Sequence, residues 1–191
     1  MAPRYQGVDY FGISTLLSDE ERLVQATFRR FVDDEIMPTI GRHFRDGTFD
    51  PQWPRRLGAL GALGASLHGY GCAGLNPVAY GLIMQELERG DSGVRSFASV
   101  QGALVMYPIH AFGSEVQMAR YFPGLACGEL IGYFGLTEPK ADSDPAGMKT
   151  RARRVNGGYV LTGAKTWSSN APISDVFIVW PPSKVDGGKI R

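Results

Sequence analysis

The spacing of apolar residues changes near Leu130, and this change constrains the fold more than any other feature of the sequence. Before it, apolar residues recur at helical intervals, as they do from Val24 to Val32. After it, short runs rich in β-branched and aromatic residues alternate with turn residues. The sequence therefore predicts an N-terminal all-α helical domain over residues 1–128, followed by a β-domain over residues 129–191.

Helix-capping residues set the expected boundaries in the first domain. Ser18 is followed three residues later by Glu21, which is the pattern of a capping box at a helix N-terminus. Pro77 suits the first position of another helix, where its missing N–H costs nothing. One helix is therefore expected after Ser18, and others over residues 52–63, 77–89, 92–107 and 114–123.

Turn residues set the expected strands of the second domain. Asn156-Gly157-Gly158 separates two β-rich runs and predicts a hairpin over residues 151–162. Val176–Trp180 predicts a further strand, and residues 186–188 predict a further turn. The expected fold class is α+β, with the first strands of an antiparallel β-barrel-like domain. Because an open sheet edge would remain after the last turn, the β-domain is expected to be incomplete over residues 129–191.

Composition argues against several classes of function. The chain has 43% hydrophobic and 20% charged residues with a formal net charge of +1, which gives no electrostatic reason to expect a nucleic acid or membrane partner. Cys72 and Cys127 are isolated and the three histidines are scattered, so no metal site is expected. No apolar run reaches the roughly 18 residues that a spanning helix needs. A cytoplasmic protein is expected, or a processed mitochondrial-matrix protein if the source is eukaryotic.

Two segments of the second domain carry the most chemical content. They are FGLTEPKADSDP (Phe134–Pro145) and GAKTWSSN (Gly163–Asn170). A flavin needs a flat apolar wall, hydrogen bonds to its ring edge and donors for its pyrophosphate, because the protein places and tunes the ring. Together the segments predict such a cradle, with a strand end, a turn and a second strand that carries Trp167. Each segment alone also fits a simpler interpretation, namely a strand that exits into a turn and a core tryptophan.

The candidate cofactor residues have roles that follow from their side-chain chemistry. Phe134 and Trp167 can wall the ring, and Thr137 can offer a hydroxyl. Ser143 and nearby backbone amides can meet phosphate oxygens, and Ser169 offers a hydroxyl beside the tryptophan. The full set is Phe134, Gly135, Leu136, Thr137, Ser143, Trp167, Ser168 and Ser169.

These two segments resemble the FAD-contacting segments of the acyl-CoA dehydrogenase family, and the resemblance covers nearly the whole chain, including RYFPGLACGE (Arg120–Glu129). It implies FAD as cofactor and a homotetramer of subunits with a helical domain, a β-domain and a C-terminal four-helix domain. It also implies that a glutamate base removes the α-proton of an acyl-CoA, that the β-hydride passes to flavin N5, and that electrons pass on to an electron-transfer flavoprotein. The family carries this glutamate in the C-terminal domain, which is expected to be absent, so no catalytic residue and no turnover are expected from these 191 residues.

Three further segments resemble the glutaryl-CoA dehydrogenase branch of this family. They are GYGCAG (Gly69–Gly74), ELERGDSGVRSFASVQ (Glu86–Gln101) and LVMYPIHAFGSE (Leu104–Glu115). This resemblance implies oxidative decarboxylation of glutaryl-CoA to crotonyl-CoA and CO₂. It implies that Arg95 pairs with the distal carboxylate, a role that suits a permanently charged, bidentate guanidinium. The candidate substrate residues are Arg95, Ser96, Ser99, Glu88 and Ser143, where Glu88 helps to set the polarity of the pocket and Ser143 also meets the cofactor.

Two positions depart from the family pattern. Asp142 stands where the family usually has glycine, and Ser168 where it usually has isoleucine. A carboxylate near a pyrophosphate is unfavourable, so weaker FAD binding is expected. Alternatives are an inactive truncated paralogue that binds flavin or acyl-CoA, a dehydrogenase for another acyl chain, and an Arg95 that is solvated or pairs with Glu88.

Overall fold

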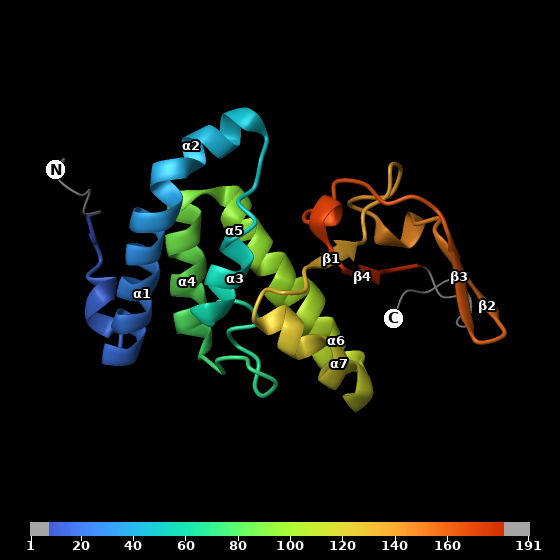
Figure 1. The fold of residues 1–191 in the computed structure, drawn as a ribbon, viewed down its shortest axis with the longest axis horizontal. Coiled ribbons are helices and arrows are strands. Elements are labelled where there is room, and N and C mark those ends of the chain that lie inside the picture. The colour runs from blue at the N-terminus through green and yellow to red at the C-terminus, as the bar shows by residue number, and fades with distance from the viewer. Residues whose placement is uncertain (1–7, 182–191) are drawn as a thin grey trace. The chain divides into compact units, whose positions relative to one another are not determined.

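The computed structural model describes residues 8–181, in which helices come first along the chain and strands last (Figure 1). The helical elements are η1 (Ile13–Leu16), α1 (Asp19–Phe31), η2 (Val32–Ile36), α2 (Met37–Asp46), α3 (Trp53–Ala59), α4 (Pro77–Gly90), α5 (Ser92–Ser99), η3 (Val100–Met106), α6 (Tyr107–Phe112), α7 (Glu115–Ala126), η4 (Pro145–Gly147) and η5 (Ala171–Ile173). The strands are β1 (Gly132–Gly135), β2 (Arg151–Val155), β3 (Gly158–Thr162) and β4 (Val176–Val179). The predicted α+β class is confirmed, while the turn predicted at residues 186–188 lies outside the described residues.

Internal contacts divide the chain into two units. One takes the residues up to Phe49 together with Leu75–Val94, and the other takes Asp50–Gly74 and the residues from Arg95 onward. The change from helices to strands falls between α7 and β1. The division into domains at residue 128 stays a prediction.

In the first unit, α1 lies along α4 (Figure 1). The predicted capping box begins α1: the Glu21 N–H donates to Ser18 Oγ at 3.2 Å, and the Ser18 N–H donates to Glu21 Oε2 at 2.8 Å. Phe28 on α1 and Ile83 and Leu87 on α4 are buried. The amphipathic spacing of both helices therefore supplies the apolar core of this unit.

A buried carboxylate also joins these two helices. Glu86 on α4 is only 1% exposed, and its Oε2 accepts from Arg29 Nε at 3.3 Å and from Arg89 Nε at 2.8 Å. Arg89 extends the network to Asp33, with a separation of 2.8 Å. Two guanidinium groups thus compensate a charge that water cannot reach.

α5, η3 and α6 form one continuous helical stretch that ends at Phe112; from Arg95 onward this stretch belongs to the second unit, as does α7. η3 is a π-helix, and its Val105 and Met106 pack with Phe122 and Leu125 of α7 in one apolar core. α7 runs to Ala126, three residues further than predicted. No helix among residues 8–181 is long and apolar enough to cross a bilayer.

The four strands form two separate pairs. β2 and β3 make the predicted antiparallel hairpin. β1 and β4 pair in parallel instead, with Gly132 opposite Val176 and Gly135 opposite Val179. This pairing corrects the antiparallel arrangement expected for the first strands. The connection between β1 and β4 is long enough to contain the hairpin, so the chain can return to the starting end of β1 before β4 begins.

The helix predicted over residues 52–63 is shorter than expected. α3 ends at Ala59, and Gly61 follows with a φ of 74°, a left-handed conformation that suits glycine and stops a helix. At Gly132 a glycine is required for a different reason, namely close packing: an added Cβ would lie 2.3 Å from Val105 Cγ1. β1 can therefore approach η3 closely only because its first residue has no side chain.

Candidate functional site

The two predicted cofactor segments meet at a small cavity of about 140 Å³ in the second unit. β1 and the residues after it provide Phe134, Leu136 and Thr137, and η3 provides Val100 and Leu104. The second segment provides Thr166, Trp167, Ser168 and Ser169. Six of the eight predicted cofactor residues therefore line one cavity. Gly135 is buried in β1, and Ser143 is exposed; neither lines this cavity.

A backbone hydrogen bond joins the two segments beside this cavity. The Thr166 N–H donates to the Thr137 carbonyl at 3.0 Å. On β1, Phe134 packs against the apolar core and contacts the Trp180 ring, with 6.2 Å between centroids. Tyr133 contacts Phe177 instead, because successive strand residues point to opposite faces.

Trp167 lies in a loop, so the second strand predicted to carry it is wrong. Its φ is 54°, a left-handed conformation that a bulky residue rarely adopts, and 92% of its surface is exposed. It is therefore not the core tryptophan of the simpler interpretation. The backbone conformation interrupts any ladder at this point and directs the indole toward solvent at the cavity edge.

Hydrogen bonds on the C-terminal side of Trp167 hold this loop on β1. The Ser168 hydroxyl forms hydrogen bonds with the Tyr133 hydroxyl at 3.1 Å and with the Thr166 carbonyl at 3.2 Å. The Asn170 side chain donates to the Gly132 carbonyl at 3.2 Å. Ser168, a departure from the family pattern, thus has a hydroxyl partner on Tyr133 in this chain.

A buried ion pair supports the same junction. Lys165 Nζ lies 2.9 Å from Glu138 Oε1, and their side chains are 6% and 7% exposed. The ammonium also donates to the carbonyls of Leu136 at 2.8 Å and Trp180 at 2.9 Å. One lysine therefore ties the second segment to the first segment and to the end of β4.

Glu138 remains ionised because its carboxylate is surrounded by donors. Burial by itself raises the pKa, but the N–H groups of Lys149 at 2.6 Å and Thr150 at 2.9 Å, together with Lys165, outweigh it. The net result lowers the pKa of Glu138 from 4.5 to about 2. The sequence analysis assigns no role to Glu138 or Lys165, although Lys165 is the one charged residue in Gly163–Asn170 and was a usable signal.

Asp142 contacts one of the predicted cofactor residues directly. The Thr137 hydroxyl donates to Asp142 Oδ1 at 3.3 Å, and Asp142 is exposed. The hydroxyl that could bind a cofactor is thus engaged by the residue that departs from the family pattern. This contact supplies a second reason, besides charge, for Asp142 to affect binding at the cavity.

The predicted substrate residues of α5 are close to one another. Arg95, Ser96 and Ser99 are half-buried; Arg95 Nη1 lies 3.5 Å from Ser99 Oγ, and the Ser99 hydroxyl donates to the Ser96 carbonyl at 3.1 Å. None of the three lines the small cavity. Glu88 is exposed at the end of α4 and accepts from the Ser92 hydroxyl at 2.5 Å. It belongs to the other unit, so its place near Arg95 stays a prediction.

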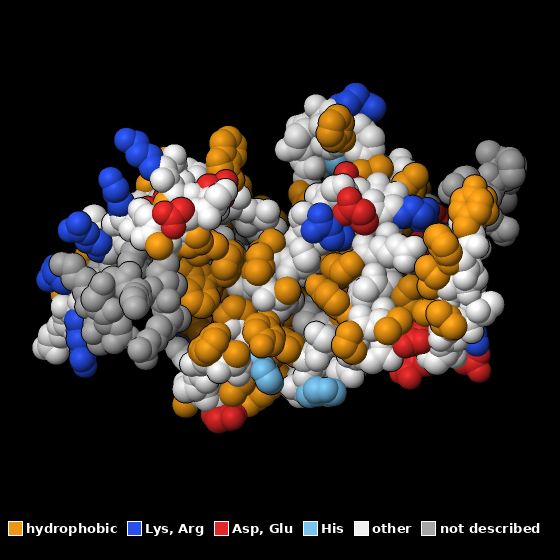
Figure 2. All heavy atoms as spheres, turned by 180° about the vertical axis from the view of Figure 1, so that it is seen from behind, with side chains coloured by type: hydrophobic (Ala, Val, Ile, Leu, Met, Phe, Trp, Pro, Cys, Tyr) orange, Lys and Arg blue, Asp and Glu red, His pale blue; other side chains and the backbone are white. Residues whose placement is uncertain are grey.

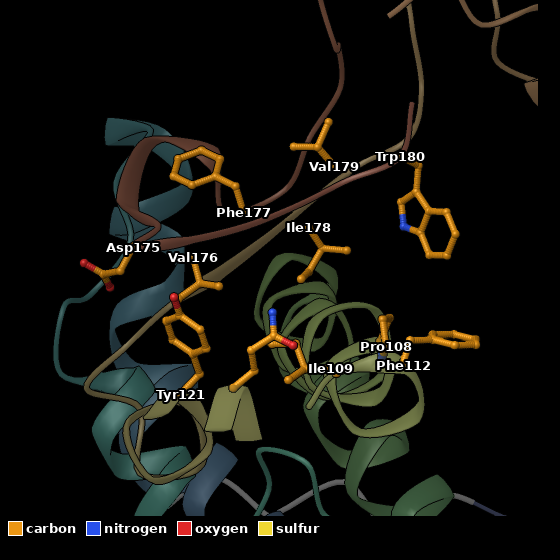
Figure 3. A pocket seen from close by; sticks show the side chains of 12 residues that line it. Pro108, Ile109, Phe112, Tyr121, Asp175, Val176, Phe177, Ile178, Val179 and Trp180 are labelled. Carbon is orange, nitrogen blue, oxygen red and sulfur yellow. The ribbon is translucent and has the colours of Figure 1, made fainter. Parts of the chain in front are cut away.

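A larger cavity of about 800 Å³ lies between β4 and the α6–α7 pair (Figure 3). Val176 and Ile178 point from β4 toward Tyr121 and Ile109, and the lining is mainly apolar. Hydrophobic side chains are also exposed elsewhere, and many appear on the face shown in Figure 2. None of the predicted cofactor or substrate residues lines the larger cavity, so the small one, where hydroxyl groups and an exposed indole converge, is the candidate site.

Across residues 8–181, no three His, Cys, Asp or Glu side chains form a cluster that could hold a metal ion. The donor set at the cavity consists instead of hydroxyl and backbone groups beside aromatic rings. Such a set suits a planar organic group with polar edges.

Comparisons with known proteins identify the family of the chain. Residues 18–129 match the family described as acyl-CoA dehydrogenase, N-terminal domain, and residues 133–189 match acyl-CoA dehydrogenase, middle domain. A glutaryl-CoA dehydrogenase from Mycobacterium smegmatis, solved in complex with FADH₂, is 49% identical with a TM-score of 0.87, over 89% of this chain and 44% of that chain. A butyryl-CoA dehydrogenase from Megasphaera elsdenii is 32% identical with a TM-score of 0.79, over 85% and 44%.

A curated relative gives the same result. A probable acyl-CoA dehydrogenase of Bacillus subtilis (strain 168) is 37% identical over 177 residues, which are 90% of this chain and 29% of the relative. The chain thus spans less than half the length of these three proteins. The two family matches together cover most of the chain, in the order helical domain and then β-domain. The chain belongs to the acyl-CoA dehydrogenase family.

Proposed function

We propose that this chain forms the helical domain and part of the β-domain of an FAD-dependent acyl-CoA dehydrogenase. The reaction proposed is the oxidative decarboxylation of glutaryl-CoA to crotonyl-CoA and CO₂, with electrons passed to an electron-transfer flavoprotein. The observation that carries this proposal is the small cavity, where six residues predicted to contact FAD converge from two distant segments. A cytoplasmic homotetramer, or a mitochondrial-matrix one, belongs to the same proposal.

The residues at the cavity fit a flavin. Val100, Leu104 and Phe134 offer apolar surface for a ring, and the exposed indole of Trp167 offers an aromatic face without displacement of core atoms. The hydroxyl of Ser169 lines the cavity and can form a hydrogen bond with the polar edge of the flavin ring. The hydroxyl of Thr137 can do the same once its hydrogen bond to Asp142 is broken. Bound FAD would supply the electron acceptor for oxidation of the acyl chain. Ser143 and its neighbouring amides are proposed to meet phosphate oxygens.

The substrate assignment rests on Arg95. Its guanidinium is permanently charged and can clamp a carboxylate through two parallel hydrogen bonds. Ser96 and Ser99 are proposed to add hydrogen bonds, and Glu88 to set the polarity around them. The higher identity to the glutaryl-CoA dehydrogenase than to the butyryl-CoA dehydrogenase supports a dicarboxylic acyl group.

No residue of this chain is proposed as the catalytic base. Glu138, the carboxylate next to the cavity residues in sequence, is engaged in a buried ion pair with Lys165. Asp142 accepts a hydrogen bond from Thr137.

We therefore expect the 191-residue chain to give no turnover of glutaryl-CoA in a dye-coupled assay with added FAD. The alternative function is a module that binds flavin or acyl-CoA without catalysis. The observation that supports this alternative is the contact between Asp142 and Thr137.

Removal of Trp167 tests the cofactor site. We expect Trp167→Ala to weaken FAD binding by at least about tenfold, because an aromatic stacking surface contributes about 1.4 kcal/mol or more when a ring covers it. The melting temperature should hardly change, since the indole is 92% exposed in the free protein. FAD titrations monitored by flavin fluorescence, together with thermal melts, provide the measurement.

A matched control for this variant is Tyr159→Ala on β3, which removes another exposed aromatic ring that does not line the cavity. It should leave FAD affinity unchanged. Equal FAD affinity in wild type and Trp167→Ala would contradict the proposed flavin site.

Substitution of Asp142 separates charge from hydrogen bonding. We expect Asp142→Gly to tighten FAD binding, because it removes a carboxylate and releases the Thr137 hydroxyl. Two unit charges about 8 Å apart at an effective dielectric near 20 repel by roughly 2 kcal/mol, so about thirtyfold is the upper bound for the charge effect. Asp142→Asn removes the charge but can still accept from Thr137, so an intermediate affinity is expected. FAD dissociation constants at two salt concentrations provide the measurement, and unchanged affinity in both variants would refute this account.

A further inference from the structure

Gln101 is the most deeply buried polar side chain near the candidate site. It lies on η3, is 0% exposed, and uses three hydrogen-bonding groups at once. Its Nε2 donates to the carbonyls of Leu125 at 2.9 Å and Leu130 at 2.8 Å, and its Oε1 accepts from the Gly132 N–H at 2.8 Å. One amide therefore connects η3 to the end of α7, to the following turn and to the first residue of β1.

The pattern of these bonds requires a glutamine. Two carbonyls must receive donors and one N–H must find an acceptor, all at the reach of a four-atom side chain. A glutamate would present oxygen to both carbonyls, and an asparagine is shorter by one methylene. Because all three partners are backbone groups that lie after η3 in the chain, the side chain ties each of them to one point on η3.

The elements joined by Gln101 are the ones that wall the small cavity. η3 contributes Val100 and Leu104, while β1 contributes Phe134. The close approach of Gly132 to Val105 fixes the spacing of the same two elements. η3 is also a π-helix, and such turns occur frequently at functional sites.

We propose that Gln101 is a positioning residue that sets the register of β1 against η3 and thereby the shape of the flavin cavity. This inference rests on the proposed function, and it assigns a role to a residue that has no direct place in the cavity lining. A purely stabilising role would make Gln101 equivalent to any other buried polar residue. A positioning role predicts that a substitution at Gln101 weakens FAD binding more than an equally destabilising substitution elsewhere. A purely stabilising role predicts equal FAD binding for the two substitutions.

The test uses the 191-residue chain with Gln101→Met, which keeps the length of the side chain and removes all three hydrogen bonds. Gln101→Asn, which keeps the amide but shortens its reach, is the second variant. Glu86→Met is the matched control, because it also replaces a buried polar side chain, in the other unit. We expect both Gln101 variants to lose FAD affinity by at least about tenfold and to shift the visible flavin spectrum. Glu86→Met should retain both properties at a similar loss of melting temperature.

A readout without cofactor distinguishes this inference from the proposed function. The N–H of Val176 donates to the Ile131 carbonyl at 3.1 Å, and that of Trp180 donates to the Gly135 carbonyl at 3.0 Å. Neither bond involves Gln101, so faster hydrogen exchange at both amides in the Gln101 variants, but not in Glu86→Met, would report a lost register. The inference would be overturned if both amides exchanged at the wild-type rate in the Gln101 variants. It would also be overturned if Glu86→Met lost FAD affinity to the same extent as the Gln101 variants. A wild-type chain that binds no FAD would instead refute the proposed function, and exchange alone would then decide whether Gln101 sets the register.

Discussion

Arg95→Ala in the proposed full-length dehydrogenase is expected to lower kcat/KM for glutaryl-CoA by about 30-fold to several thousand-fold, while kcat/KM for butyryl-CoA changes little. Truncation of one partner of a buried, hydrogen-bonded charge pair costs about 2–5 kcal/mol, which corresponds to this range. Butyryl-CoA has no distal carboxylate and makes no such pair. The measurement is a dye-coupled assay of both substrates with wild type and variant.

Two controls make the Arg95 prediction specific. Arg95→Lys keeps the charge but loses the planar, bidentate fork, so it should recover only part of the glutaryl-CoA activity. Ser99→Ala removes the hydroxyl that lies 3.5 Å from Arg95 Nη1, and its effect should be smaller than that of Arg95→Ala. Equal losses on both substrates would mean that Arg95 acts on the fold of α5 and not on the substrate carboxylate.

Lys165→Met is expected to lower the free energy of unfolding by about 3–5 kcal/mol near pH 7, because it leaves the buried Glu138 carboxylate without its ammonium partner. Lys149→Met is the matched control: it removes the same charge from an exposed side chain of the same unit, and should change stability by less than about 0.5 kcal/mol. Adding Glu138→Gln to Lys165→Met should restore part of the loss. Urea unfolding followed by tryptophan fluorescence provides the measurement. Equal stability of Lys165→Met and wild type would contradict the role of the ion pair.

The same pair predicts the direction of the pH dependence. The pKa of Glu138 is about 2 in the folded protein, against the ordinary 4.5 of a glutamate in the unfolded chain, so the unfolded state binds the proton more readily. The stabilisation is therefore complete above pH 4.5 and is lost as the pH falls from there toward about 2. In Lys165→Met the pKa of Glu138 in the folded state should rise. The difference in free energy of unfolding between wild type and Lys165→Met should therefore narrow as the pH falls from 4.5 toward about 2. A difference that stays constant down to pH 2 would show that Glu138 does not respond to Lys165.

Local features of the chain were predictable because they depend on neighbouring residues. The capping box at Ser18, the helix that begins at Pro77 and the hairpin around Asn156-Gly157 appear where the sequence indicates. Each depends on hydrogen bonds or dihedral preferences within a few residues. Six of the predicted cofactor residues line one cavity, while their contact with FAD stays a prediction. Their assignment came from the resemblance of the two ordered segments to the acyl-CoA dehydrogenase family.

Contacts between distant segments were not predictable in the same way. The parallel pairing of β1 with β4 depends on the path of the connection, and the loop around Trp167 depends on bonds to Tyr133 and Gly132. Lys165 and Glu138 are 27 residues apart, and Gln101 reaches a backbone group 31 residues away. No local propensity encodes which buried polar groups become partners, because that is fixed only when packing excludes water and leaves each group one available partner.

The sequence by itself determined the α+β class, most helix and strand positions, and the two segments that form the candidate flavin site. Only the tertiary structure decided how that site is built: an exposed indole at a residue in a left-handed conformation, a buried ion pair that joins the two segments, and one glutamine that links two of the cavity walls. The physical reason is the range of the forces involved. Caps, turns and periodicity act over a few residues, whereas the register of β1 against η3 results from desolvated polar contacts that exist only in the folded chain.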